Sequence, residues 1–144
     1  MVTYADSSFL VSLYIADGNT TSANKFIHEN PQSICLTNFS KSEVHHAIRM
    51  LVFRGNIPHD VMTRGLLYFE HDQQEGLYTS IPFNAEDLFQ KAAQLSNRHA
   101  LEFGVRYLDM LHIASALLIN AKRFLTFDAR QGKLAKAVGL EVRP

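Results

Sequence analysis

Short apolar segments alternate with helical segments along the whole chain, and this alternation most constrains the fold. Runs typical of buried strands cover residues 2–5, 33–37, 77–82, 123–127 and 140–143. Apolar side chains at helical spacing fill the stretches between them, at 7–16, 23–28, 40–54, 58–75, 84–95, 108–120 and 130–138. Such alternation predicts an α/β fold, with a parallel sheet covered by helices on both faces. Two helices connect the second and third strands, so the strand order stays open.

Four acidic residues stand where strands pass into helices or inside an apolar helix. They are Asp6, Glu43, Asp109 and Asp128. The carboxyl ends of parallel strands lie at one edge of a sheet, so acids that follow different strands converge in space. Clustered carboxylates repel one another unless a cation lies between them. We therefore predict a divalent-metal site and a metal-dependent reaction on phosphate.

Each acid also has a structural explanation. Asp6 and Asp128 both precede helices, where aspartate caps backbone amides; Ser7 or Ser8 is available to cap the first helix in place of Asp6. Ser40 and Glu43 have the spacing of a capping box, which competes with a metal role for Glu43.

Asp109 is the hardest of the four acids to explain structurally. Its neighbours are apolar, and an unpaired buried carboxylate there costs several kcal/mol or shifts its pKa. Arg106 is placed three residues earlier and is able to pair with Asp109. A polar residue in this helix nevertheless indicates a cavity.

Two hydroxyl groups lie close to these acids in the predicted fold. Ser8 follows Asp6, and Thr126 points to the same side of its strand as Asp128. Both are candidates to hydrogen-bond a carboxylate or a metal-bound water. His112, three residues after Asp109, is a possible ligand, although a satisfied core or rim histidine is the more common case. The chain has no glycine-rich phosphate loop, no G-x-S-x-G motif and no cysteine cluster.

The composition fits one globular domain over residues 1–144, with 47% hydrophobic residues. We interpret Cys35, the single cysteine, as a buried free thiol. A free thiol fits a reducing cytoplasm. No signal peptide is visible, and the longest apolar run, 113–119, is too short to span a bilayer, so we expect no membrane association.

Net charge is zero, but residues 121–144 carry six bases against two acids. A basic rim around an acidic centre is compatible with a polyanionic substrate.

The ordered set of motifs resembles the PIN-domain ribonucleases, in particular the VapC-type toxins of toxin–antitoxin pairs. The resemblance covers the whole chain and rests on residues 4–10, 36–44, 106–117, 124–128 and 139–142, with all four acids in place. It implies a three-layer α/β/α fold around a mainly parallel sheet of four or five strands. It further implies Mg²⁺ or Mn²⁺ held by Asp6, Asp109 and Asp128, with Glu43 binding metal directly or through water. A homodimer and a cognate antitoxin are implied as partners. Some relatives carry an additional acid between the third and fourth of these positions, and residues 110–127 contain none. Whether the site holds one ion or two therefore stays open.

The predicted function is hydrolysis of RNA phosphodiesters, with Arg106, Arg130 and Lys133 as candidate phosphate contacts. One alternative is a non-catalytic PIN-like module that binds RNA or a protein. Another is a metal-dependent phosphatase of small phosphate esters. The sequence identifies neither the RNA target nor the antitoxin.

Overall fold

The computed structural model describes all 144 residues, which form five strands and seven helices. The strands are β1 (Thr3–Ala5), β2 (Ile34–Leu36), β3 (Tyr78–Ser80), β4 (Arg123–Leu125) and β5 (Glu141–Arg143). The helices are α1 (Ser7–Tyr14), α2 (Thr20–Glu29), α3 (Asn38–Phe53), α4 (His59–Gln74), α5 (Ala85–Phe103), α6 (Tyr107–Leu118) and α7 (Ala129–Ala137). Every predicted strand and helix is present. The largest difference is at α5, which continues past residue 95 until Gly104, at a φ of 61°, ends it.

All five strands are parallel and lie in the order β3-β2-β1-β4-β5. The central strand is β1, where Tyr4 stands opposite Cys35 on one side and Phe124 on the other. The α/β class with a parallel sheet is therefore confirmed, and the strand order that the sequence left open is settled. The carboxyl end of β1 opens directly into α1, and that of β4 leads into α7.

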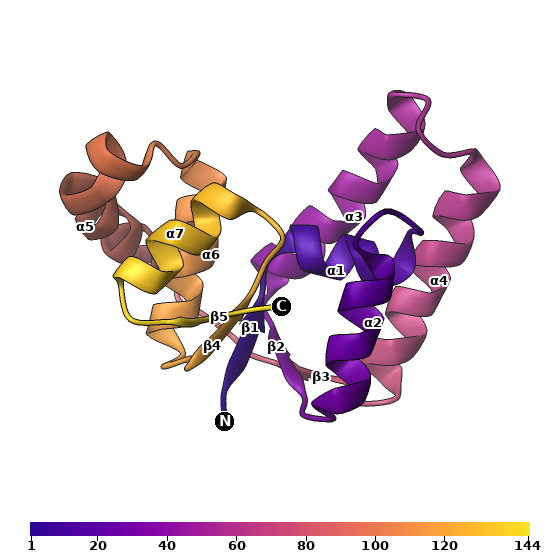
Figure 1. Cartoon of the computed structure of the whole chain (residues 1–144), viewed down its shortest axis with the longest axis horizontal. Coiled ribbons are helices and arrows are strands. Elements are labelled where there is room, and N and C mark those ends of the chain that lie inside the picture. Colours follow the sequence, from indigo (N-terminus) through magenta and orange to yellow (C-terminus); the bar gives the residue numbers. More distant parts are fainter.

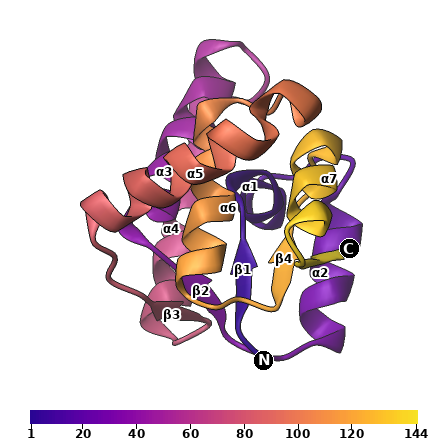
Figure 2. The same ribbon diagram turned by 90° about the vertical axis from the view of Figure 1, so that its left-hand side faces the viewer.

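Two groups of helices cover the two faces of the sheet (Figures 1 and 2). Helices α1 to α4 lie on one face and α5 to α7 on the other. Adjacent residues of β1 point to opposite faces, as a strand requires: Tyr4 belongs to the core beneath α5, α6 and α7, and Ala5 to the core beneath α1 to α4. Each face thus buries its own apolar cluster, which gives the three-layer α/β/α arrangement.

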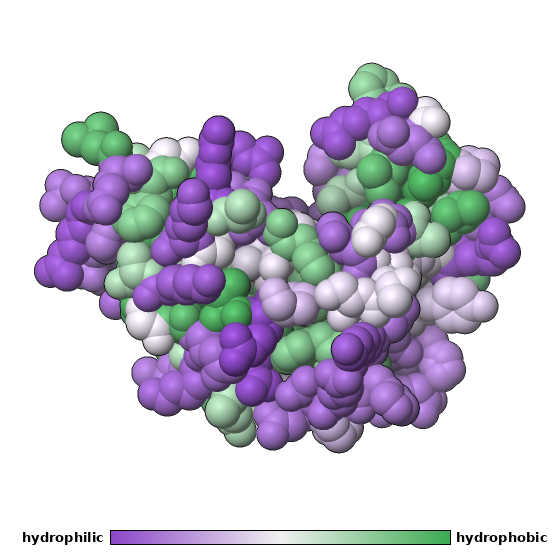
Figure 3. Space-filling view, viewed as in Figure 1, coloured by the Kyte–Doolittle hydropathy of each residue, from purple (hydrophilic) through white to green (hydrophobic).

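The molecular surface is hollowed between the two groups of helices. In Figure 3 the hollow separates the part built by α5, α6 and α7 from the tip of the α3–α4 hairpin, with hydrophilic side chains along its rims. The carboxyl ends of β1 and β4 point toward its floor (Figure 1). Ligands of open α/β sheets bind at this edge. No helix in the structure is both long and apolar enough to cross a membrane.

Candidate active site

Asp6 lies at the junction of β1 and α1 and is 2% exposed. Its Oδ1 accepts hydrogen bonds from the Phe9 amide (3.0 Å) and the Ser8 hydroxyl (2.7 Å). Its Oδ2 accepts one from the Thr126 hydroxyl at 2.5 Å. Asp6 is therefore the residue that caps α1, and the expectation that Ser7 or Ser8 is free to do so is wrong. Ser8 instead points at the Asp6 carboxylate.

Burial is the main influence on the Asp6 carboxyl. It raises the pKa of Asp6, against the opposing effects of the His112 charge and of the hydrogen bonds from Thr126, Phe9 and Ser8. No lysine, arginine or histidine side chain forms an ion pair with Asp6. An ionised Asp6 is thus a buried negative charge without an ion-pair partner in the protein.

Glu43 extends from α3 toward α1 and α6. The alternative capping box between Ser40 and Glu43 does not form, because α3 begins two residues before Ser40. Thr37 caps the helix through the Ser40 amide at 3.1 Å, and the Ser40 hydroxyl accepts from the Thr37 amide at 2.9 Å. Glu43 is released from capping by this arrangement. Its Oε1 accepts hydrogen bonds from the Ser7 hydroxyl and from His112 Nε2, the latter at 2.6 Å.

The surroundings of Glu43 keep its carboxyl ionised. Burial alone would raise the pKa of Glu43, but the hydrogen bond and charge of His112, the Ser7 hydroxyl and the Arg106 charge together lower it. His112 is fully buried and its Nδ1 lies 2.7 Å from the Tyr4 hydroxyl, so both ring nitrogens are engaged. His112 is therefore a core histidine with both ring nitrogens hydrogen-bonded, which is the more common case for a buried histidine. One of its two partners, Glu43, is a candidate site residue.

Asp109 and Asp128 face a shared cavity of about 450 Å³ between the start of α6 and the start of α7. Arg106 and Arg130 also line this cavity. The Arg106 Nε donates to Asp109 Oδ2 at 3.3 Å, as the spacing of the two residues predicted. Asp128 caps α7, with its Oδ1 accepting from the Gln131 amide at 2.9 Å. Both aspartates thus line a polar cavity together with two arginines.

Thr126 connects Asp6 to the segment that carries Asp128. Its hydroxyl donates to Asp6 and accepts from the Asp128 amide at 3.0 Å. Ser8 accepts from the neighbouring Phe127 amide at 3.1 Å. The two hydroxyls that the sequence singled out therefore fix the carboxyl ends of β1 and β4 relative to each other.

The four carboxylates lie at one edge of the sheet but do not converge on one point. No group of three or more aspartate, glutamate, histidine or cysteine side chains is arranged to hold a single ion. Four like charges repel when no cation lies between them. Here serine and threonine hydroxyls and His112 hold Asp6 and Glu43, Arg106 holds Asp109, and the Gln131 amide holds Asp128.

The donor chemistry fits a hard divalent cation. Carboxylate oxygens are the ligands that Mg²⁺ and Mn²⁺ prefer. Asp6 forms no ion pair in the protein, and Asp109 pairs only with the exposed Arg106. A cation would supply the charge that this edge of the sheet lacks. The role of the four acids as metal ligands stays a prediction.

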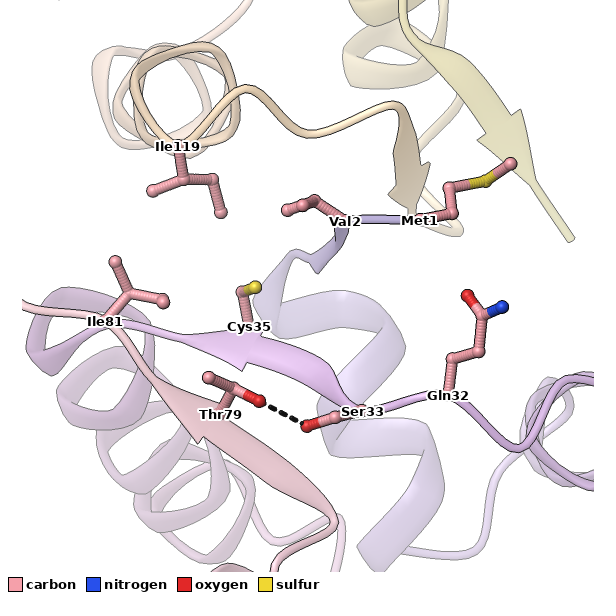
Figure 4. A pocket seen from close by; sticks show the side chains of 8 residues that line it. All are labelled: Met1, Val2, Gln32, Ser33, Cys35, Thr79, Ile81 and Ile119. Carbon is pink, nitrogen blue, oxygen red and sulfur yellow. Dashed lines mark hydrogen bonds between the residues drawn. The ribbon is translucent and has the colours of Figure 1, made fainter.

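A larger cavity, about 520 Å³, lies on the β2–β3 side of the sheet and carries different chemistry (Figure 4). Val2, Cys35, Ile81 and Ile119 point into it, and the Ser33 and Thr79 hydroxyls hydrogen-bond at 2.6 Å beside it. Cys35 is a buried free thiol, as predicted, and burial raises its pKa. With no aspartate, glutamate, histidine, lysine or arginine side chain in its lining, this cavity is a poor candidate for a catalytic site.

Fold and site together define an α/β protein with an acidic site at the carboxyl edge of a parallel sheet. Residues 3–137 match the PIN domain model, and the chain belongs to the PIN-domain family. No curated protein matches the chain in sequence.

Several solved structures share this fold over nearly the full chain. VapC20 of Mycobacterium tuberculosis, a toxin that cleaves the sarcin-ricin loop, has a TM-score of 0.71 at 20% identity, with 99% of each chain covered. FitAcB of Neisseria gonorrhoeae has a TM-score of 0.68 at 14% identity, covering 99% of this chain and 97% of that one. VapBC2 of Rickettsia felis, solved with a promoter DNA fragment, has a TM-score of 0.66 at 14% identity, covering 99% and 98%. At these identities the likeness establishes the fold.

Proposed function

We propose that the protein is a divalent-metal-dependent endoribonuclease that hydrolyses RNA phosphodiesters and serves as the VapC-type toxin of a toxin–antitoxin pair. The observation that carries this proposal is the buried Asp6 carboxylate, without a cationic partner, at the edge of the sheet that also bears Glu43, Asp109 and Asp128. Membership in the PIN-domain family and the shared fold with VapC20 support it.

Asp6, Asp109 and Asp128 would hold the ion, which is Mg²⁺ or Mn²⁺. Such a cation makes water more acidic and neutralises charge on the phosphate and the leaving oxygen. Glu43 orients the attacking water through its carboxylate, which His112 and Ser7 hold in place. The water oxygen forms a new bond to phosphorus as the P–O bond to one ribose oxygen breaks, and the proton that the water loses balances the proton that the leaving oxygen gains.

Arg106 and Arg130 are proposed to bind the phosphates on either side of the scissile bond. Both line the cavity that Asp109 and Asp128 share. Lys133 lies one turn beyond Arg130 on α7 and is exposed, so it extends the same positive surface. Contacts of this kind add affinity without reading sequence.

The test is cleavage of total RNA by Asp6→Asn and Asp128→Asn, with and without Mg²⁺ or Mn²⁺. Both variants should lose cleavage by at least about 100-fold, because each removes a ligand charge that the transition state requires. The matched control is Asp87→Asn, which neutralises an exposed aspartate on α5 and should cleave normally. Undiminished metal-dependent cleavage by both site variants would reject the proposal.

One observation favours a second candidate, the non-catalytic PIN-like binding module. The carboxylates do not converge into a three-ligand group. A binding module should associate with RNA while showing neither turnover nor a response to metal. Titrating Mn²⁺ into the protein in the presence of labelled RNA separates the two possibilities.

We further propose a cognate antitoxin, a homodimer and a cytoplasmic location. The antitoxin is supported by the shared fold with toxin–antitoxin structures such as VapBC2. An RNA substrate and the free Cys35 thiol both fit the cytoplasm. Growth arrest on expression, relieved by co-expression of an adjacent small gene product, tests the antitoxin, and light scattering tests the dimer.

A further inference from the structure

Three side chains from different elements form a buried hydrogen-bonded chain that ends at the candidate active site. The Tyr4 hydroxyl of β1 lies 2.7 Å from His112 Nδ1, and His112 Nε2 of α6 lies 2.6 Å from Glu43 Oε1 of α3. Tyr4 and His112 have no exposed surface. The chain therefore joins the central strand, the α6 side of the sheet and the α3 side.

The ring of His112 has little freedom to rotate. Its centroid lies 4.7 Å from that of Phe39 and 5.8 Å from that of Tyr4, so two aromatic rings pack against it. Both nitrogens have partners, and turning the ring over would exchange them. Packing and hydrogen bonding thus define a single orientation of the imidazole.

The partners also define which way the ring faces. A glutamate carboxylate at neutral pH only accepts, so His112 Nε2 carries the hydrogen in this contact. Nδ1 meets the Tyr4 hydroxyl, from which it accepts in a neutral ring and to which it donates in an imidazolium. In both cases Tyr4 holds the ring so that it presents an N–H to Glu43, although Tyr4 itself does not touch the acid.

The result at Glu43 is asymmetric. Oε1 accepts from both Ser7 and His112, whereas Oε2 accepts no hydrogen bond from the protein and is not a buried unsatisfied atom. The glutamate side chain is 19% exposed. One oxygen is therefore anchored and the other is left available to water or a cation.

We propose that Tyr4 and His112 are positioning residues for Glu43, fixing its Oε1 so that Oε2 is presented to the reacting water. This inference rests on the proposed function for the task of Glu43, and on the hydrogen-bonded chain for the positioning itself. Groups that orient a site carboxylate through hydrogen bonds commonly change activity by about 10–100-fold when removed.

The kinetic test uses Tyr4→Phe, which removes one hydroxyl and touches none of the four acids. We expect kcat for RNA cleavage to fall by about 10-fold or more, with KM nearly unchanged, because Glu43 loses its fixed orientation and the RNA contacts remain. Tyr68→Phe is the matched control: it removes an exposed hydroxyl from α4 and should leave both constants unchanged.

Two replacements at His112 separate positioning from support of the fold. His112→Gln retains an N–H donor near the place of Nε2, and His112→Leu retains only apolar volume. Glutamine should recover a clear part of the kcat that leucine loses. Equal losses for the two variants, in step with equal losses of thermal stability, would overturn the proposal and leave His112 a core residue only.

A spectroscopic readout is independent of activity. In ¹⁵N–¹H spectra of the histidine side chains, the signal that His112→Gln removes should report an Nε2–H in one fixed hydrogen-bonded environment in the wild-type protein. Tyr4→Phe and Glu43→Gln should each shift or broaden that signal, and Tyr68→Phe should not. A wild-type His112 that carries no hydrogen on Nε2, or a signal indifferent to Tyr4→Phe, would overturn the positioning claim. Wild-type protein that cleaves no RNA would refute the proposed function, and this spectrum would then decide the positioning claim by itself.

Discussion

Asp6 combines a structural role with a proposed catalytic one. Its Oδ1 caps α1 through the Phe9 amide, and its Oδ2 meets the Thr126 hydroxyl of the neighbouring strand. Burial nonetheless raises its pKa, so keeping it ionised opposes folding in the absence of a cation. Active-site residues that hold a charge in a buried environment commonly lower the stability of the folded protein.

The Asp6→Asn variant should therefore be more stable than the wild type in metal-free buffer at about pH 7, by roughly 1 kcal/mol. The folded pKa of Asp6 lies above its unfolded value, so the folded state binds more protons between the two values. Wild-type stability accordingly falls as pH rises through that window, and the advantage of asparagine shrinks as pH falls to about 4.

Urea denaturation in chelator across this pH range measures the difference, with Asp87→Asn as the control for loss of an exposed aspartate charge. A less stable Asp6→Asn at neutral pH would mean that the Ser8, Thr126 and Phe9 hydrogen bonds to the carboxylate outweigh its burial.

At the level of elements, close approach between α1 and α4 depends on a single glycine. A β-carbon placed on Gly65 would lie 2.6 Å from Ile15 Cδ1 and 3.1 Å from the Tyr14 carbonyl oxygen. The isoleucine tip is able to shift, but the backbone oxygen is not. Gly132 of α7 is a useful contrast, because its β-carbon would meet side chains at 3.5 and 3.6 Å, an ordinary contact distance.

Gly65→Ala should lower the free energy of unfolding by about 1 kcal/mol or more, since overpacking outweighs the gain in helix propensity. Gly132→Ala should raise it by about 0.5–1 kcal/mol, because only the propensity gain remains. Chemical denaturation of the two variants beside the wild type gives both values. A stabilised Gly65→Ala would show that α1 and α4 separate at little cost.

The elements were largely predictable because strand and helix periodicities are local. The start of α3 was not: Ser40 and Glu43 match the usual capping box, yet Thr37 and Ser40 form the box instead. A serine is an uncommon partner at the third helical position, so the local pattern favoured the wrong register. The capping box therefore lies one helical turn earlier than the sequence pattern indicates. Because of this shift, Glu43 is free of a capping role and remains a candidate site residue.

Contacts between distant residues account for most of what the sequence did not reveal. His112 and Glu43 are 69 positions apart, and Tyr4 and His112 are 108 apart. Weak signals existed: His112 follows Asp109 by one helical turn, and Tyr4 precedes Asp6 by two strand positions. Neither spacing indicates that the two side chains meet each other.

At the scale of the whole molecule, two helical layers meet over an edge of the sheet where negative charge is concentrated. Asp6 directly precedes α1 and Glu43 lies in α3, on one side of the sheet. Asp109 lies in α6 and Asp128 directly precedes α7, on the other side. A cation bound between carboxylates from both sides would join the two halves of the fold. Because it would bind the folded chain and have no assembled site in the unfolded chain, it would also stabilise the protein.

Mn²⁺ at about 100 times its Kd should therefore raise stability by about 2.7 kcal/mol over protein in chelator. For a domain of this size, that corresponds to an increase in Tm of roughly 5–10 °C. Thermal denaturation with and without Mn²⁺ measures the shift, which should persist in Asp87→Asn and vanish in Asp128→Asn, whose lost carboxylate faces the shared cavity. An equal shift in wild type and Asp128→Asn would place ion binding elsewhere on the surface, because a ligand lost from the proposed site could not leave the linkage unchanged.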